Sequence, residues 1–438
     1  MKTIDKIPTT KIQRASKMLK FGTQVGANYI KYFGEKLVSD PIIAKTRLDE
    51  ANAEDIYNGL SELKGSALKV AQMMSMDEEL LPTAFVEKFS LAQFSVPPLS
   101  APLSKKVISK ELGGDPLKKF DRINYTSAYA ASIGQVHEAW KGEQKFALKV
   151  QYPGVAESIS SDLNLIKPFA LLMFNLKSAE VEDYFVEVKN KLHEETDYNL
   201  ELEQLNEISD ACQHLEGLLF PKFFKEYSSK YLLTMEWMEG LHLSEYTASR
   251  ISIELRNEVA QTLWDFFMYQ IHVLQKVHAD PHPGNFLVNN QNKLIALDFG
   301  CVKVLPKEFY DSYFELTKID NINNPKKLLE LLDELELILE GDNAEEKKLI
   351  TDTFKDVLSI LNQPFQFDVF DFSQPEYFSD LLKLGGTLKD DKRLRELNGS
   401  RGSKHFLYVN RTLFGLLGLM NSLKAGPIQV MNYKKYEV

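Results

Sequence analysis

The chain has 438 residues, of which 44% are hydrophobic and 26% are charged, and these values are typical of a globular protein with one large domain or about two or three smaller ones. Its two cysteines, Cys212 and Cys301, exclude a disulfide framework and a cysteine metal site, and they favour a reducing compartment. The net charge of −10 argues against nucleic-acid binding, and no apolar run approaches the roughly eighteen residues of a membrane span.

Residues 1–93 are predicted to be helical throughout. Between Ile12 and Phe33, apolar residues recur at helix spacing with lysines among them. Residues 1–36 carry eight Lys or Arg and two acidic residues, a net charge of +6, which leaves −16 on the remainder. A basic amphipathic helix lies either on an anionic membrane surface or against its own domain with the basic side in solvent, and both alternatives stay open. The start of the chain lacks the apolar core of a secretory signal.

A second helical stretch, residues 53–76, contains the sequence Lys69-Val-Ala-Gln72. Lys69 and Gln72 are three residues apart, so they share one helix face. Three prolines, at positions 97, 98 and 102, then interrupt the helical pattern and predict a linker.

From about residue 120 the pattern becomes that of β-strands. Strands are expected at residues 125–131, 135–140 and 145–151, and the third carries Lys149. In protein kinases, the turn after the first strand covers the phosphates and the third strand supplies a lysine. A helical region, two strands and a hinge-like segment follow, at residues 181–216, 218–223, 231–236 and 237–240.

The most informative motif follows a long helix that is predicted at residues 251–277 and expected to be buried. It reads His278-Ala-Asp-Pro-His-Pro-Gly-Asn285 and is followed by Asp298-Phe-Gly300. These two segments match the H-x-D-x-x-x-x-N catalytic loop and the D-F-G turn of protein kinases. We interpret His278 as a structural residue, and His282 as either a phosphate contact or a packing residue.

Short strands predicted at residues 286–288 and 293–297 join the two motifs through an Asn-rich turn. Such a hairpin would bring Asn285 and Asp298 together as two oxygen ligands for Mg²⁺. Asp280 would then accept a proton from an attacking hydroxyl or water. Beyond residue 305 the chain is predicted to be helical, which leaves almost no activation segment after Gly300.

Four segments together resemble the UbiB-like (ADCK-type) atypical kinases over roughly residues 1–420. They are the catalytic loop, Ser132-Ile-Gly-Gln-Val-His137, Lys149-Val-Gln-Tyr-Pro-Gly154 and Glu195-Thr-Asp-Tyr198. The resemblance implies an α+β, protein-kinase-like, two-lobed fold with an added N-terminal helical extension. The expected domains are the extension at residues 1–95, a small β-rich N-lobe at 96–236 and a helical C-lobe at 237–438.

The resemblance also implies roles for individual residues. Lys149 should contact the α- and β-phosphates and pair with Glu201. The nucleotide-binding set is completed by an alanine-rich loop in place of a glycine-rich one and by hinge residues, namely Ala130, Ala131, Ser132, Gly134, Glu236 and Met238.

Two further family motifs complete the expected site. Lys69 and Gln72 correspond to a K-x-G-Q motif, and Glu195 and Asp197 to an E-x-D motif, so Lys69 would pair with Glu195, with Glu194 as the alternative partner. Ala71 stands where the family has glycine. The metal ligands are then Asn285 and Asp298, and the expected catalytic residues are Asp280, Lys149, Lys69, Glu195 and Gln72.

The function that the resemblance implies is an atypical kinase-like ATPase that uses ATP and Mg²⁺. It would support isoprenoid quinone biosynthesis or lipid handling at a membrane surface, with an anionic membrane, a lipid or isoprenoid, and quinone-biosynthesis enzymes as partners, and with no nucleic acid. The alternative is a nucleotide-binding pseudokinase scaffold that organises such enzymes. A small-molecule or protein kinase is less favoured, and the alanine-rich loop and the short activation segment disfavour a protein kinase in particular. We expect a cytoplasmic protein whose membrane attachment, if any, is peripheral.

Overall fold

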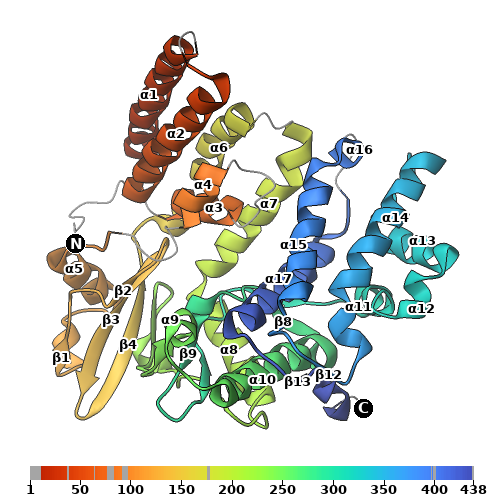
Figure 1. Ribbon diagram of the computed structural model, residues 1–438. Helices are drawn as coiled ribbons and strands as arrows, with labels where there is room; N and C mark the ends of the chain where they lie inside the picture. Colours follow the sequence, from red (N-terminus) through yellow and green to blue (C-terminus); the bar gives the residue numbers. More distant parts are fainter. Residues whose placement is uncertain are drawn as a thin grey trace. The chain divides into compact units, whose positions relative to one another are not determined.

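The structure is a computed structural model that describes residues 11–36, 39–63, 65–75, 83–90, 97–174, 178–395, 397 and 401–436 (Figure 1). It consists of two units. Unit 1 comprises the chain up to Leu202 together with Lys222–Trp237, and unit 2 comprises Glu203–Pro221 together with the chain from Met238 onward. The helices of the predicted extension and the first β-sheet therefore belong to the same unit. The three predicted domains stay a prediction.

Unit 1 begins with four helices, α1 (Lys11–Glu35), α2 (Pro41–Leu63), α3 (Ser66–Ser75) and α4 (Thr83–Ser90). They confirm the helical prediction for the described part of residues 1–93. Helices α2 to α4 share a buried apolar core with α6 (Val155–Phe174) and α7 (Ser178–Glu195), to which Leu60, Leu68, Phe85, Leu163 and Leu192 belong. Their apolar residues recur every three or four positions, and burying that face is what stabilises each helix.

The predicted linker is shorter than expected. Pro97 and Pro98 lie in irregular chain, but Pro102 lies in the first turn of helix α5 (Ala101–Glu111). Proline is tolerated there because the first N–H groups of a helix have no partner within it. Pro102 therefore starts a helix, and the prediction that it marks a linker was wrong.

A five-stranded antiparallel sheet follows in unit 1, in the order β1-β3-β4-β6 with β2 paired to β3. Its strands are β1 (Arg122–Ile123), β2 (Tyr129–Ala130), β3 (Gly134–Lys141), β4 (Gln144–Gln151) and β6 (Leu232–Glu236). The predicted second and third strands are confirmed, whereas the first, predicted at residues 125–131, is reduced to β2. Phe146, Leu148 and Val150 of β4 alternate into a core with α5, so Lys149 points to the opposite face.

Helix α8 (Tyr198–Ala211) runs from unit 1 into unit 2. Unit 2 has a four-stranded sheet in the order β5-β10-β9-β7, formed by β5 (Leu218–Leu219), β10 (Leu294–Ala296), β9 (Phe286–Val288) and β7 (Leu241–His242). A separate pair joins β8 (Lys276–His278) to β11 (Val302–Val304). The strands predicted on either side of the Asn-rich turn are confirmed as β9 and β10.

Helices make up most of the rest of unit 2. They are α9 (Leu243–Ala248), α10 (Ile253–Tyr269), α11 (Lys307–Glu315), α12 (Ile319–Ile322), α13 (Pro325–Glu334), α14 (Ala344–Leu361), α15 (Pro375–Asp390), α16 (Lys392–Arg395) and α17 (Lys404–Leu423). A two-residue strand pair, β12 (Val369–Phe370) with β13 (Ile428–Gln429), was not predicted. Among the described residues, no helix combines the length and the apolar character needed to cross a membrane.

Helix α10 is buried through Leu263, Phe266 and Phe267, as predicted, but it ends earlier than expected. One π-helical turn, Gln270–Leu274, follows it, and Gln275 then adopts a left-handed conformation with φ 50°. The buried Gln270 explains the ending, because its side chain donates to Phe266 O and accepts from the N–H of His278. The chain thereby turns from helix into β8 just before the catalytic loop.

Candidate active site

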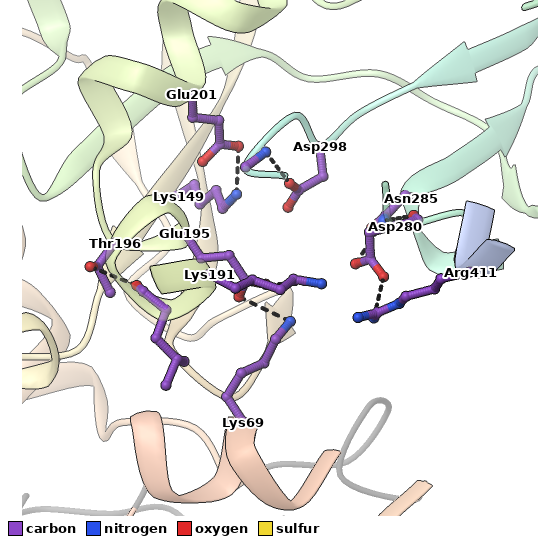
Figure 2. A network of polar contacts seen from close by, with 12 residues as sticks. Lys69, Lys149, Lys191, Glu195, Thr196, Glu201, Asp280, Asn285, Asp298 and Arg411 are labelled. Carbon is purple, nitrogen blue, oxygen red and sulfur yellow. Dashed lines mark hydrogen bonds and ion pairs between the residues drawn. The ribbon is translucent and has the colours of Figure 1, made fainter. Parts of the chain in front are cut away.

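Lys149 lies near the middle of β4, between Val136 of β3 and Leu233 of β6. Its Nζ is 2.6 Å from Glu201 Oε1 in the first turn of α8 (Figure 2). The same Nζ lies 5.3 Å from the centre of the Tyr198 ring. The Glu201 side chain is 2% exposed and that of Lys149 is 18% exposed, so the carboxylate is buried and the ammonium is partly accessible. The expected Lys149–Glu201 ion pair is confirmed.

The alanine-rich loop connects β2 to β3. Ala130 pairs with Gln135, and the N–H of Ala131 donates to Gly134 O at 2.8 Å. Gly134 is required by its neighbours, because a Cβ atom there would lie 2.7 Å from Val150 O. Ser132 is buried, and its carbonyl oxygen accepts a hydrogen bond of 2.7 Å from the N–H of Gly65. The loop is therefore held both by its own sheet and by the residue that precedes α3.

Lys69 of α3 forms an ion pair with Glu195 at the end of α7, with 3.0 Å between Nζ and Oε2. The predicted partner, Glu195, is confirmed. The same carboxylate lies 3.7 Å from Nζ of Lys191, a side chain that is only 2% exposed. Sequence reasoning missed Lys191, although its spacing of four residues from Glu195 was a usable signal.

The other residues of these two motifs have different positions. Asp197 caps helix α8, because its Oδ1 accepts from the N–H groups of Asn199 and Leu200 at 3.1 Å and 3.3 Å. Gln72 lies within α3, but its side chain, like that of Ala71, falls outside the described residues. The predicted role of Gln72 stays a prediction.

Glu236 belongs to unit 1 and Met238 to unit 2. Glu236 ends β6, pairs with Phe146, and accepts at Oε2 from the N–H of Lys222 at 3.3 Å. Met238 begins the second segment of unit 2 and is half-buried. Their predicted contact with a nucleotide stays a prediction.

Unit 2 brings together Asp280, Asn285 and the Asp298 turn. Asn285 Nδ2 donates to Asp280 O at 2.9 Å, and its contact with Asp280 Oδ2 is 3.5 Å (Figure 2). The N–H of Leu297, next to Asp298, donates to Asn285 O at 3.0 Å. The N–H of Ala279 donates to Cys301 O at 2.8 Å and ties the catalytic loop to the other side of the same turn. The expected loop-strand-turn-strand frame is therefore present.

The donor set on this frame suits Mg²⁺. Because Asn285 donates through Nδ2, its Oδ1 remains an acceptor, and Asp298 adds a carboxylate that is oriented by a 2.9 Å bond from the N–H of Gly300. Mg²⁺ prefers oxygen ligands and commonly takes only one or two carboxylates from the protein. Within the described ranges, no group of three or more His, Cys, Asp or Glu side chains is arranged to hold a metal. Asn285 and Asp298 could hold Mg²⁺ together with phosphate oxygens and water.

The two histidines of the loop have structural contacts. His278 is buried and packs edge-on against Phe267, Phe286 and Phe299. His282 accepts at Nδ1 from the N–H of Gly284 at 3.1 Å and so caps the short 3₁₀ turn Pro283–Asn285. His278 is therefore a packing residue, as predicted, and the contact of His282 supports the packing alternative.

Sequence reasoning missed a cationic side chain next to Asp280. Nη2 of Arg411, on helix α17, lies 3.3 Å from Asp280 Oδ1 (Figure 2). The two residues are 131 positions apart, and no motif around Arg411 indicated such a contact. Cys301, next to the D-F-G turn, is buried.

Residues 91–332, more than half of the chain, match the family described as the ABC1 atypical kinase-like domain. The chain is 29% identical over 378 residues to the atypical kinase COQ8B, mitochondrial, of Danio rerio, which covers 84% of this chain and 60% of that protein. It is also 29% identical over 379 residues to the atypical kinase COQ8, mitochondrial, of Saccharomyces cerevisiae, covering 84% of this chain and 74% of that protein.

Among solved structures, the complex of Rv3197 with erythromycin from Mycobacterium tuberculosis is similar, with a TM-score of 0.60 and 23% sequence identity. The match covers 90% of this chain and 98% of that chain. This likeness establishes the shared fold. The α+β architecture is thus the predicted kinase-like one, and the chain belongs to the ABC1 atypical kinase-like family, of which the UbiB-like proteins are members.

Proposed function

We propose that the protein is an atypical kinase-like ATPase that uses Mg-ATP and supports isoprenoid quinone biosynthesis or lipid handling at a membrane surface. The observation that carries the proposal is the hairpin frame that holds Asp280, Asn285 and Asp298 together in unit 2. Membership of the ABC1 family and the names of its curated relatives as atypical kinases support it.

Phosphoryl transfer depends mainly on positioning and on neutralising the charge of the phosphates. Mg²⁺, when bound, supplies part of that neutralisation, and Asn285 and Asp298 would hold it. Lys149, oriented by the buried Glu201, would donate to phosphate oxygens. Asp280 would orient the attacking water or hydroxyl and accept its proton. Glu236 and Met238 of the hinge, with Ala130, Ala131, Ser132 and Gly134, would contact the nucleotide.

Two features favour water or a small acceptor over a protein substrate. Strand β11 ends at Val304 and helix α11 begins at Lys307, so only a short segment follows the Asp298-Phe-Gly300 turn. The methyl groups of Ala130 and Ala131 also keep that backbone farther from phosphates than glycine would. The Lys69–Glu195 ion pair supports a role for α3, and with it Gln72, in nucleotide use.

Helix α1 supports the membrane part of the proposal. Its packing on its own unit, one of the two alternatives left open, is confirmed by the buried Arg14 and Val25. On its outer side, Ile30 and Phe33 are 76% and 62% exposed, next to the exposed Lys31. Apolar side chains beside lysines fit an anionic lipid surface, which offers hydrocarbon and negative charge together.

The deciding experiment measures phosphate release from ATP with and without Mg²⁺. We expect Asp298→Asn to abolish Mg²⁺-dependent release. The control is Asp380→Asn, the same change at an exposed aspartate that pairs with Lys383 on α15, and it should leave the rate unchanged. Undiminished hydrolysis by Asp298→Asn would contradict the metal assignment. If the wild type binds ATP but releases no phosphate, with or without anionic lipid, the scaffold alternative would replace the proposal.

The membrane contact is tested separately by sedimentation with vesicles of anionic or neutral lipid. The double variant Ile30→Ser, Phe33→Ser should lose binding to anionic vesicles. Leu382→Ser, which removes an equally exposed apolar side chain from α15 in unit 2, should bind as the wild type does. Equal binding by both variants would exclude α1 as the contact.

A further inference from the structure

Helix α17 brings a guanidinium to the catalytic loop from far along the chain. Nη2 of Arg411 lies 3.3 Å from Asp280 Oδ1, and both side chains are about a quarter exposed, at 28% and 21%. The other oxygen of the same carboxylate, Oδ2, lies 3.5 Å from Asn285 Nδ2. Each of the two oxygens of Asp280 therefore has its own donor, Arg411 at Oδ1 and Asn285 at Oδ2.

Side chains just before Arg411 attach α17 to its neighbours. The hydroxyl of Tyr313, on α11, donates to Asn410 Oδ1 at 2.5 Å. Lys303 of β11 lies 4.7 Å from the centre of the Tyr408 ring. The helix turn that carries Arg411 is thus anchored to α11 and to the strand that follows the D-F-G turn.

Gly415 sets how closely α17 approaches the loop. A Cβ atom at this position would lie 2.3 Å from Cγ of Pro281, the residue next to Asp280, a distance that no real structure tolerates. Pro281 is buried and its ring is rigid, so it cannot yield as a flexible side chain would. Arg411 and Gly415 are four residues apart and share one face of the helix. The close approach at Gly415 is therefore what places Arg411 against Asp280.

A partly exposed ion pair usually contributes little to stability, so stability alone does not account for this arrangement. The partner of Arg411 is the aspartate of the H-x-D-x-x-x-x-N loop, and residues 281–284 of that loop contain no Lys or Arg. Arg411, on α17, brings a cationic group to the Asp280 carboxylate from outside the loop.

We infer that Arg411 is a positioning residue for the phosphoryl-transfer step and that Gly415 sets its distance from the loop. Arg411 holds the Asp280 carboxylate in one orientation, with Oδ1 against the guanidinium, so that the carboxylate stays aligned with the attacking oxygen. An arginine suits this task because its planar group donates in a fixed geometry. The inference rests on the proposed function and deepens it.

The test compares two glycines of the same helix. A Cβ atom at Gly418 would meet nothing within 4 Å, whereas one at Gly415 would meet Pro281. Alanine favours a helix more than glycine does, so any loss in Gly415→Ala comes from the contact and not from the helix itself. In the ATPase assay we expect Gly415→Ala to lower kcat by about 10- to 100-fold, because small displacements of a catalytic group cost that much. The KM for ATP should change little, and Gly418→Ala should match the wild type.

Substitutions of the arginine itself complete the test. Arg411→Gln should lower kcat by about 10- to 100-fold with little change in KM for ATP, and Arg411→Lys should recover part of the loss because it restores one charged donor. A purely structural role would instead lower the active fraction and Tm together and leave the kcat of the folded protein intact. Unchanged kcat in both Arg411→Gln and Gly415→Ala would overturn the inference.

Failure of the proposed function gives a different result. If the wild type releases no phosphate, the pair is measured by a double-mutant cycle on Tm with Arg411→Gln, Asp280→Asn and the double variant. Coupled residues give a double variant whose change in Tm is smaller than the sum of the two single changes. Additive changes would show that Arg411 does not hold Asp280, and would overturn the inference even without an ATPase activity.

Discussion

The N–H of Gly65 donates a hydrogen bond of 2.7 Å to the carbonyl oxygen of Ser132, so the chain enters helix α3 directly against the alanine-rich loop. One turn further along α3, Lys69 pairs with Glu195. The helical extension therefore contacts the loop through its backbone and helix α7 through a charge. Within unit 1, the extension is positioned to influence the loop that we assign to the nucleotide.

Gly65 should not tolerate a side chain. Its φ is +67°, and a Cβ atom would lie 2.9 Å from Cγ2 of Val155. We expect Gly65→Ala to lower the free energy of unfolding by about 1–3 kcal/mol and to raise the KM for ATP, because the loop loses its support. Urea unfolding and steady-state kinetics measure the two effects.

Gly26 provides the control, since it lies in α1 and a Cβ atom there would meet nothing within 4 Å. Gly26→Ala should be neutral or stabilising by up to about 1 kcal/mol. Equal behaviour of the two variants would mean that the Gly65 contact does not hold the loop.

Arg14 should anchor α1 to the rest of unit 1. Its guanidinium donates to both oxygens of Asp162 at 2.6 Å, and the two side chains are 3% and 1% exposed. Arg14→Ala would leave the Asp162 carboxylate buried without its arginine, although Ser66 and Ser158 also donate to it. Loss of one partner of a buried pair costs about 3–5 kcal/mol, and we expect the free energy of unfolding to fall by that order.

Lys17 on the same helix is the matched control for Arg14. It pairs with Glu62 at 2.6 Å, but the side chains are 41% and 58% exposed. Lys17→Ala should therefore change the free energy of unfolding by less than about 1 kcal/mol. Unfolding in guanidinium chloride should show a clearly larger loss of unfolding free energy in Arg14→Ala than in Lys17→Ala. Similar losses in the two variants would mean that the burial of the Arg14–Asp162 pair does not increase its contribution to stability.

The Lys149–Glu201 pair should behave as a coupled unit. Glu201→Gln removes the buried charge that orients Lys149, so we expect a raised KM for ATP and reduced stability, as for other buried pairs. The double variant Lys149→Met, Glu201→Leu should be more stable than Glu201→Gln while lacking ATPase activity, because it leaves neither charge unpaired. A double variant that unfolds more easily than the single one would contradict this explanation.

Sequence reasoning succeeded where the signal was local. Lys149 lies on a strand whose alternation is evident, and Asn285 and Asp298 are linked by a hairpin of short strands. The ending of α10 was missed because it depends on Gln270, whose side chain accepts from the N–H of His278 in strand β8, which comes later in the sequence. Strands β12 and β13 have two residues each, too few to show a period.

Long-range contacts explain the remaining omissions. Arg411 reaches Asp280 across 131 positions, and Arg14 reaches Asp162 across 148. Nothing in the residues around either arginine distinguishes it from a solvent-exposed one. Such pairs are determined by helix packing, and in the case of Arg411 by the close approach of Gly415 to Pro281.

The free energy of unfolding should decrease as the pH is lowered, because of His137. This histidine is fully buried in β3, where burial lowers its pKa from 6.5 to about 4, against the smaller opposing effect of backbone hydrogen bonds. Its Nδ1 donates to Asn124 O at 2.9 Å, which leaves Nε2 to accept from Gln135 Nε2 at 2.7 Å, so the neutral ring satisfies both contacts. Between about pH 6.5 and pH 4 the unfolded chain binds a proton that the folded protein does not.

The free energy of unfolding should therefore decrease by up to about 1.4 kcal/mol for each unit by which the pH is lowered across this window. The stabilising contribution of His137 is fully present at pH values above the window. His272, whose pKa is lowered to about 3 by burial and by Lys434, adds a decrease of the same sign. Urea unfolding at several pH values should show a weaker dependence in His137→Gln than in the wild type. An unchanged pH dependence in that variant would mean that His137 binds its proton equally well in the folded and unfolded states, and that the buried Gln135–His137–Asn124 chain does not require the neutral ring.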